Sequence, residues 1–159
     1  MFILNSIGIR VTPKQIYFTI ANKDTEGNIS IYSPDKLIVP QSLDIPNCLT
    51  FIRTNLISII NEYNVKLGAI RIIEGNSQTK DTFRINMEGV IQELFANSSV
   101  ESYFCGTINS LSKRLRFKQA DIKDALDSKK SKNIFKLDYW DKFKKEEKES
   151  ILFSIAALH

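Results

Sequence analysis

The chain has 159 residues, of which 43% are hydrophobic, and a formal net charge of +4. These values fit one globular domain over residues 1–159, with enough apolar residues for a sizeable core. No apolar run approaches the roughly 18 residues that a membrane span needs. The first residues are typical of a strand and lack the basic start of a signal peptide. We therefore expect a cytoplasmic protein with no membrane partner.

Few residue types are available for catalysis. The two cysteines, Cys48 and Cys105, lie far apart and outside metal-binding spacings, which predicts two free, buried thiols. The one histidine is the last residue, His159. This argues against Ser-His and Cys-His nucleophilic catalysis and against histidine-based metal sites. Any catalysis is therefore expected to use carboxylates.

The positive charge is concentrated in one segment. Residues 113–148 contain thirteen Lys or Arg residues and seven Asp or Glu residues, a balance of +6, whereas the rest of the chain has a balance of −2. Such asymmetry indicates a polyanion partner such as nucleic acid. The alternative is a solvated, lysine-rich surface. The basic residues selected as a nucleic-acid contact, with Phe117 between them to stack on a base, are Lys113, Arg114, Arg116 and Lys118.

The first third of the chain is rich in β-branched and aromatic residues. Residues 2–11, 16–22 and 29–33 predict three antiparallel strands, with Gly27 in the hairpin loop before the third. Residues 34–46 contain several prolines and predict an irregular connection.

The remainder alternates helical and extended patterns. Apolar residues at steps of three and four predict helices over residues 45–64 and 82–96. Between them, Leu67 to Glu74 predicts a buried strand ending in a carboxylate, followed by a polar loop that includes Gly75-Asn76-Ser77. The remaining predicted elements are a strand at 100–106 and helices at 109–117, 120–127 and 139–158. The order βββαβαβα predicts an α/β fold with a mixed five-stranded sheet and helices on both faces.

This order resembles the ribonuclease H-like fold, and three segments resemble RuvC-type Holliday-junction resolvases. Ser6-Ile-Gly-Ile-Arg10 is similar to their first strand, which reads Ile-Gly-Ile-Asp. Ala69-Ile-Arg-Ile-Ile-Glu74 is similar to their fourth strand, which ends in a catalytic Glu, and residues 147–159 resemble their last helix, which carries two Asp residues. The chain also resembles a group of uncharacterised bacterial proteins of this size, through Phe83-Arg-Ile-Asn-Met-Glu-Gly-Val-Ile-Gln-Glu93.

The resemblance implies a set of candidate catalytic residues. In active resolvases the carboxylates hold two divalent ions, Mg²⁺ or Mn²⁺, which activate a water for phosphodiester hydrolysis. Glu74 matches the fourth-strand Glu and is the candidate metal ligand. Glu147 and Glu149 lie near the positions of the two Asp residues, and in one register Ser150 falls where an Asp belongs.

One residue departs from the resolvase pattern. Arg10 stands where the first-strand Asp would be, and a guanidinium stays protonated and cannot bind a metal. We expect Arg10 to pair with Glu74 and Glu88 to face the same pocket. This favours a degenerate metal site in a non-catalytic module that binds nucleic acid or a protein partner. The alternatives are a metal-dependent nuclease that uses the remaining carboxylates, and an interaction protein that forms a homodimer.

Overall fold

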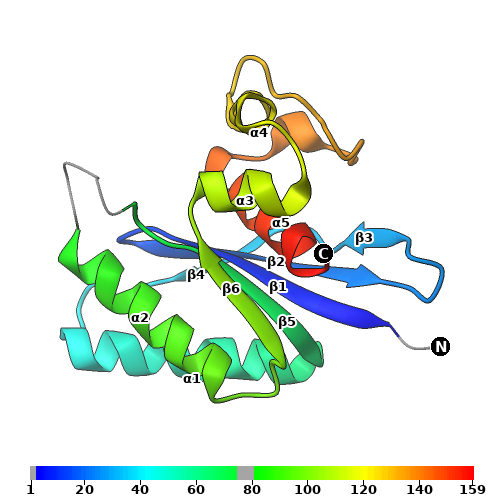
Figure 1. Cartoon of the computed structure of the whole chain (residues 1–159). Helices are drawn as coiled ribbons and strands as arrows, with labels where there is room; N and C mark the ends of the chain where they lie inside the picture. Colours follow the sequence, from blue (N-terminus) through cyan, green and yellow to red (C-terminus); the bar gives the residue numbers. More distant parts are fainter. Residues whose placement is uncertain (1–2, 75–80) are drawn as a thin grey trace.

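The described residues, 3–74 and 81–159, form a mixed sheet with helices on both faces in this computed structural model (Figure 1). The strands are β1 (Leu4–Val11), β2 (Gln15–Lys23), β3 (Ile29–Ile31), β4 (Asp35–Ile38), β5 (Val65–Arg71) and β6 (Ser102–Gly106). The helices are α1 (Ile45–Glu62), α2 (Thr82–Ala96), α3 (Ile108–Leu115), α4 (Gln119–Leu126) and α5 (Lys145–Ala157), with a 3₁₀ turn at Trp140–Lys142.

The sheet joins an antiparallel half to a parallel half. Its strand order is β3-β2-β1-β5-β6, and β4 also pairs with β2. Strands β1 and β2 are antiparallel, whereas β1, β5 and β6 run parallel. The predicted α/β fold with a mixed sheet is therefore confirmed.

Strand β4 is the element that the sequence did not predict. It pairs with the first half of β2, and β3 pairs with the second half, so both lie along one edge of β2. Pro34 and Pro40 flank it, which suits an edge strand because proline cannot donate to a ladder. The prediction of one long connection over residues 34–46 is wrong for this reason, and the third strand ends at Ile31.

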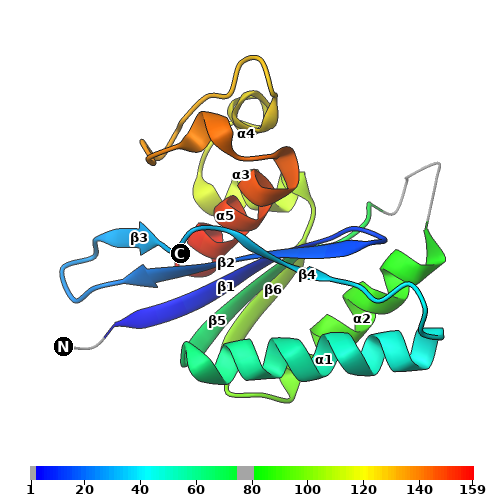
Figure 2. The same cartoon turned by 180° about the vertical axis from the view of Figure 1, so that it is seen from behind.

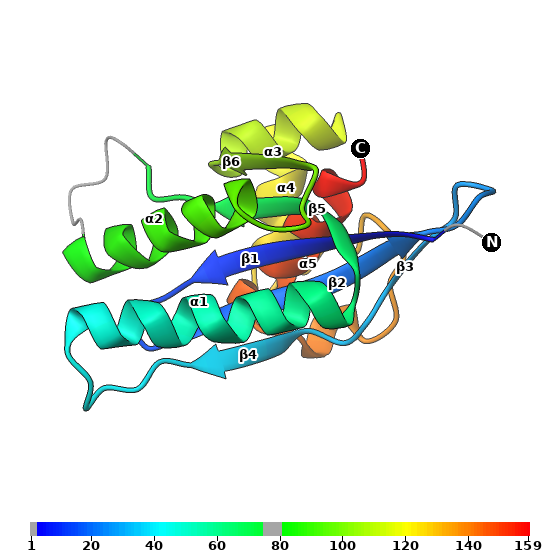
Figure 3. The same cartoon turned by 90° about the horizontal axis from the view of Figure 1, so that it is seen from below.

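Different helices pack against the two faces of the sheet. Helices α1 and α2 cover one face, and α3, α4 and α5 lie on the other (Figures 1 and 3). The alternation of β1 accounts for this division, since Ile7, Ile9 and Val11 all enter the core formed with α1 and α2. The other face of β1 carries Ser6, Gly8 and Arg10 and meets α5.

Helix α5 lies directly against β1 because the contact residues are small. A Cβ atom on Gly8 would overlap the Ser150 carbonyl oxygen and the Ser154 nitrogen. Ser6 Oγ donates to the Ser154 carbonyl oxygen at 2.7 Å, and Thr19 Oγ1 lies 2.7 Å from Ser150 Oγ. These contacts fix the register of α5 over the sheet. They set the first turns of α5 above the C-terminal end of β1.

The final helix differs from its prediction. It begins at Lys145, after the 3₁₀ turn, rather than at Tyr139. Ten of its residues are buried, including Lys148 and Glu149, because α3 and α4 cover the side that faces away from the sheet. Its apolar residues Ile151, Leu152 and Ile155 are therefore only part of its buried surface.

Two further expectations concern the chain as a whole. Within residues 3–74 and 81–159, no helix combines the length and apolarity that crossing a membrane requires. Both cysteines are free, as predicted, with Cys48 buried and Cys105 half-buried. Burial raises the pKa of the Cys105 thiol, with the nearby Glu88 carboxylate acting in the same direction.

Candidate functional site

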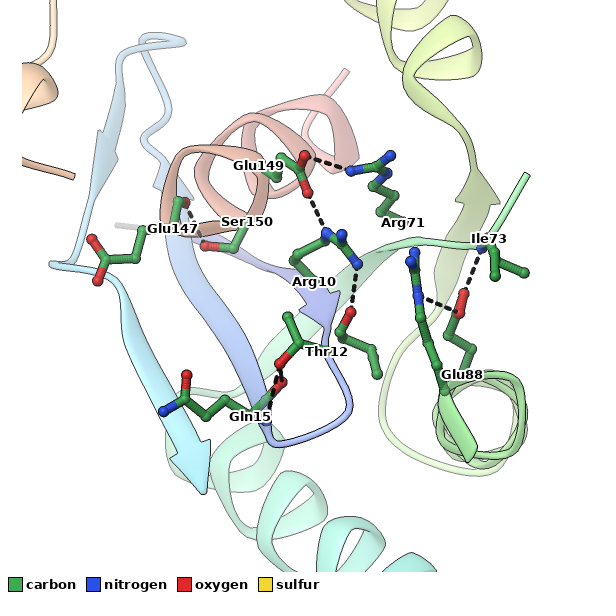
Figure 4. A network of polar contacts seen from close by, with 11 residues as sticks. Arg10, Thr12, Gln15, Arg71, Ile73, Glu88, Glu147, Glu149 and Ser150 are labelled. Carbon is green, nitrogen blue, oxygen red and sulfur yellow. Dashed lines mark hydrogen bonds and ion pairs between the residues drawn. The ribbon is translucent and has the colours of Figure 1, made fainter. Parts of the chain in front are cut away.

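Two arginines lie side by side at the C-terminal ends of the central parallel strands. Arg10 of β1 is in register with Arg71 of β5. Neighbouring residues of adjacent strands project to the same face of a sheet. Here that face is covered by α5, and both guanidinium groups reach Glu149 on its second turn (Figure 4).

Glu149 is held between these two cations. Its side chain is 0% exposed, against 14% for Arg10 and 17% for Arg71. Arg71 Nη1 donates to Glu149 Oε1 at 2.5 Å, and Arg10 Nε pairs with Oε2. Burial lowers the pKa of Arg10, and the Glu149 carboxylate opposes this shift. The two oxygens of Glu149 are thus both taken by guanidinium groups.

Glu88 of α2 is a second buried carboxylate near these arginines. Its Oε1 accepts the backbone N–H of Ile73 at 2.6 Å, and its Oε2 lies 3.3 Å from Arg84 Nε (Figure 4). Burial raises the pKa of Glu88, against the opposing effects of Arg84 and of the hydrogen bond from Ile73. Glu88 therefore anchors the chain directly after β5 to α2.

The predicted pair of Arg10 with Glu74 is wrong. Strand β5 ends at Arg71, and Glu74 is exposed three residues later. Arg10 pairs with Glu149 instead, because α5 closes over the strand ends and brings that carboxylate directly above them. The segment Gly75-Asn76-Ser77, which the sequence suggested as a polar loop, lies outside the described residues.

The other predicted carboxylates do not converge on this site. Glu147 Oε2 accepts the backbone N–H of Lys144 at 3.0 Å at the start of α5, and its side chain points away from Arg10 (Figure 4). Ser150 bonds to Thr19 between α5 and β2. Across residues 3–74 and 81–159, no three His, Cys, Asp or Glu side chains gather where they could hold a metal ion.

The predicted basic residues are exposed on and after α3, but one of them has internal partners. Arg114 Nε donates to the Ala156 carbonyl oxygen at 2.8 Å, and its guanidinium lies 4.4 Å above the Phe104 ring. Phe117 packs edge-on against Phe135, with ring centroids 5.6 Å apart. Phe117 therefore belongs to the core rather than to a surface that stacks on a base.

A cavity of about 440 Å³ opens beside Arg71. It lies between the end of β5, the start of α5 and helix α4. Its lining residues are Arg71, Glu74, Ile108, Gln119, Lys123, Leu126, Asp127, Lys145 and Glu149. Three cations line this cavity and were not predicted as site residues from the sequence: Arg71, Lys123 and Lys145. Strand pairing would have indicated Arg71, since it follows the apolar run of β5 just as Arg10 follows that of β1.

The fold was compared with known proteins. No protein-family model and no curated protein sequence matches the chain. Among solved structures, RuvC of Thermus thermophilus superposes with a TM-score of 0.75 at 8% identity, covering 96% of this chain and 92% of that one. The chain has a ribonuclease H-like fold.

Two other structures agree with this assignment. The yeast mitochondrial Holliday junction resolvase Ydc2 gives a TM-score of 0.57 at 13% identity, covering 96% of this chain and 77% of that one. The Fowlpox virus resolvase, in complex with Holliday junction DNA, gives 0.55 at 16% identity, covering 96% and 95%. The predicted ribonuclease H-like, RuvC-like fold is confirmed.

The side chains at the strand ends of this ribonuclease H-like fold do not suit a divalent ion. Mg²⁺ requires hard oxygen ligands in near-octahedral geometry. Here the Glu149 oxygens are bound by Arg10 and Arg71, and those of Glu88 by Ile73 and Arg84. A cation entering this cluster would have to displace guanidinium groups that carry the same charge.

Proposed function

We propose that this chain is a non-catalytic, RuvC-like module that binds nucleic acid beside Arg71. One observation carries the proposal. Arg10 and Arg71 take up both oxygens of the buried Glu149, at the strand ends where the resemblance to resolvases implies metal-binding carboxylates. An arginine cluster in this place favours binding of an anion over activation of a water by a metal.

The charge of the cluster supports an anionic ligand. Three guanidinium groups (Arg10, Arg71 and Arg84) face two carboxylates (Glu149 and Glu88), which leaves one positive charge in excess. Arg71 lines the cavity, and its side chain is 17% exposed, so part of its guanidinium group can be reached by a ligand. Arginine donors of this kind suit phosphate oxygens.

The surroundings of the cavity extend this positive surface. Lys123 and Lys145 line it together with Arg71. Lys118, one of the exposed basic residues predicted to contact nucleic acid, directly precedes Gln119 in the cavity wall. A phosphate backbone that crosses the cavity would therefore continue along the end of α3. RuvC of T. thermophilus and the Fowlpox virus resolvase, which share this fold, were both solved with Holliday junction DNA.

The experiment that tests the proposal is fluorescence anisotropy with a labelled four-way junction, a duplex and a single strand. Each is titrated over a salt series, first with EDTA and then with Mn²⁺, and the end points are resolved on a denaturing gel. Binding is expected to weaken steeply with salt, because phosphate neutralisation releases counterions. Affinity is expected to be indifferent to metal, with no strand cleaved.

Charge-reversal variants locate the surface. Lys123→Glu with Lys145→Glu is expected to weaken binding about tenfold or more and to flatten the salt dependence. The matched control is Lys23→Glu with Lys66→Glu, two positions at the opposite end of the sheet. A second test changes Lys113, Arg116 and Lys118 to Glu and spares Arg114, whose internal contacts would confound the result.

Three results would contradict the proposal. Cleavage that requires Mn²⁺ would establish the alternative, a metal-dependent nuclease. Equal losses in the cavity variant and the control would move the binding surface elsewhere. Absence of binding at low salt would leave a protein partner or a homodimer as the role of this fold.

A further inference from the structure

A second cavity, of about 490 Å³, lies on the same side of the sheet and has a different character. One wall is the edge strand β3 with the residues that follow it, and the other is the segment between α4 and α5, which passes over β3 (Figure 2). The lining residues are Ile29, Ser30, Ile31, Ser33, Lys136, Leu137, Asp138, Tyr139 and Phe143. Its floor is thus apolar, and its rim carries hydroxyl groups and charges. The size is that of a small-ligand site.

Tyr139 is held at this rim in an exposed position. Its side chain is 69% exposed, although Leu137 and Phe143 on either side pack against the core. Its φ of 62° lies in the left-handed region, which is unfavourable for a bulky residue. Such conformations persist where the surrounding structure enforces them, and they cluster at ligand-binding sites.

The segment that carries Tyr139 is well anchored. The Asn133 side chain donates to the Leu137 carbonyl oxygen at 2.7 Å and accepts the Leu137 N–H at 2.8 Å. The Trp140 ring, which follows Tyr139, is 3% exposed. Lys142 Nζ lies 5.1 Å from the centre of the Tyr139 ring. The tyrosine is therefore presented in one position, with a cation beside it.

We propose that this cavity binds an unpaired base of a single-stranded nucleic acid, stacked on Tyr139. The inference rests on the proposed function, because it assumes a nucleic-acid partner. Apolar residues suit the faces of a base, the Ser33 hydroxyl suits its edge, and Lys136 and Lys142 suit the flanking phosphates.

The lysines around the cavity favour a nucleic-acid base over an apolar peptide side chain as its occupant. One wall of the cavity, which carries Lys136, Asp138 and Tyr139, belongs to the segment 113–148, and that segment has a balance of +6. Lys136 and Lys142 flank Tyr139 in sequence, and a phosphate is attached to every base of a strand. Single-strand binding sites combine these two features, an aromatic platform and a basic track.

The test measures single-strand and duplex affinities for the full chain and three variants. Tyr139→Leu removes the aromatic ring but keeps an apolar side chain, and Tyr139→Phe is its matched control. Ser33→Trp fills the cavity from the opposite wall and leaves Tyr139 unchanged. Single strands carrying 5-iodouracil are irradiated in complex with the unaltered chain, and the cross-linked peptide is identified by mass spectrometry.

Tyr139→Leu and Ser33→Trp are expected to weaken single-strand binding about tenfold, and to change duplex binding less than about twofold. Tyr139→Phe should retain the affinity, and the cross-link should fall on the peptide with Tyr139. This inference would be overturned if Tyr139→Leu and Ser33→Trp bound single strands as tightly as the unaltered chain. If binding were still weakened by Lys123→Glu with Lys145→Glu, the proposed function would stand. Absence of any binding by the unaltered chain would overturn both.

Discussion

Replacement of Arg10 by alanine tests the buried cluster most directly. In the structure this change removes the guanidinium from Glu149 Oε2 and leaves Arg71 on Oε1. The carboxylate is 0% exposed, so water cannot replace the lost partner without a rearrangement of α5. Arg10→Ala therefore leaves Glu149 Oε2 buried without its partner, while the Arg71–Glu149 ion pair remains.

The expected cost follows from this burial. Breaking a buried ion pair from one side costs about 3–5 kcal/mol, and the remaining Arg71 contact favours the lower end. At this chain length, a loss of about 3 kcal/mol in the free energy of unfolding lowers Tm by about 6–12 °C.

Thermal and urea unfolding, followed by circular dichroism, measure these changes. The matched control is Arg53→Ala, since Arg53 and Glu93 form an exposed pair with N–O separation of 3.0 Å and exposed fractions of 34% and 53%. That pair is worth at most about 1 kcal/mol. Glu74→Ala should change stability by less than about 0.5 kcal/mol. A loss for Arg10→Ala no larger than that for Arg53→Ala would refute the reasoning, and a large loss for Glu74→Ala would restore Glu74 as the partner.

Four further predictions concern two glycines and two glutamates. Gly8→Ala should abolish cooperative unfolding or lower Tm severely, because the added methyl overlaps the α5 backbone. Gly89→Ala, on an open face of α2, should instead stabilise the chain by about 0.5–1 kcal/mol in the same melts. Burial raises the pKa of Glu88 above the ordinary value of a glutamate, so the folded chain binds more protons than the unfolded chain. The contribution of Glu88 to stability is full below the pKa of the unfolded chain and falls as pH rises through the folded pKa. The Tm of Glu88→Gln relative to the unaltered chain should thus increase from about pH 4 to about pH 7, and a flat or decreasing difference would contradict this. Glu147→Ala should cost about 1 kcal/mol, because the backbone N–H of Lys144 loses its acceptor at the start of α5, and an unchanged urea midpoint would show that this hydrogen bond is dispensable.

Local patterns predicted most of the architecture. Helices α1 and α2 carry apolar residues at helical spacing, and each begins after an Asp that caps it, Asp44 and Asp81. The β-rich composition of residues 2–11 predicted β1, and in the structure its alternation places Ile7, Ile9 and Val11 in the core formed with α1 and α2. Strand β4 was not predicted, because its four residues lie between prolines and form no local pattern. Only their pairing with β2 makes them a strand.

The contacts of the candidate site, unlike the helices and strands, were predicted only in part from the sequence. The sequence by itself determined that Arg10 replaces an acidic residue of the resembled strand, and that the last helix carries carboxylates. Only the tertiary structure decided that Arg10 pairs with Glu149 rather than Glu74, and that Arg71 joins it. The physical reason is that this contact depends on where β5 ends and on how α5 sits over β1. Gly8 sets the close approach of α5, while the hydroxyl contacts of Ser6 and Thr19 fix its register. Contacts of this kind join residues that are far apart in the sequence, and no local pattern of residue types encodes them.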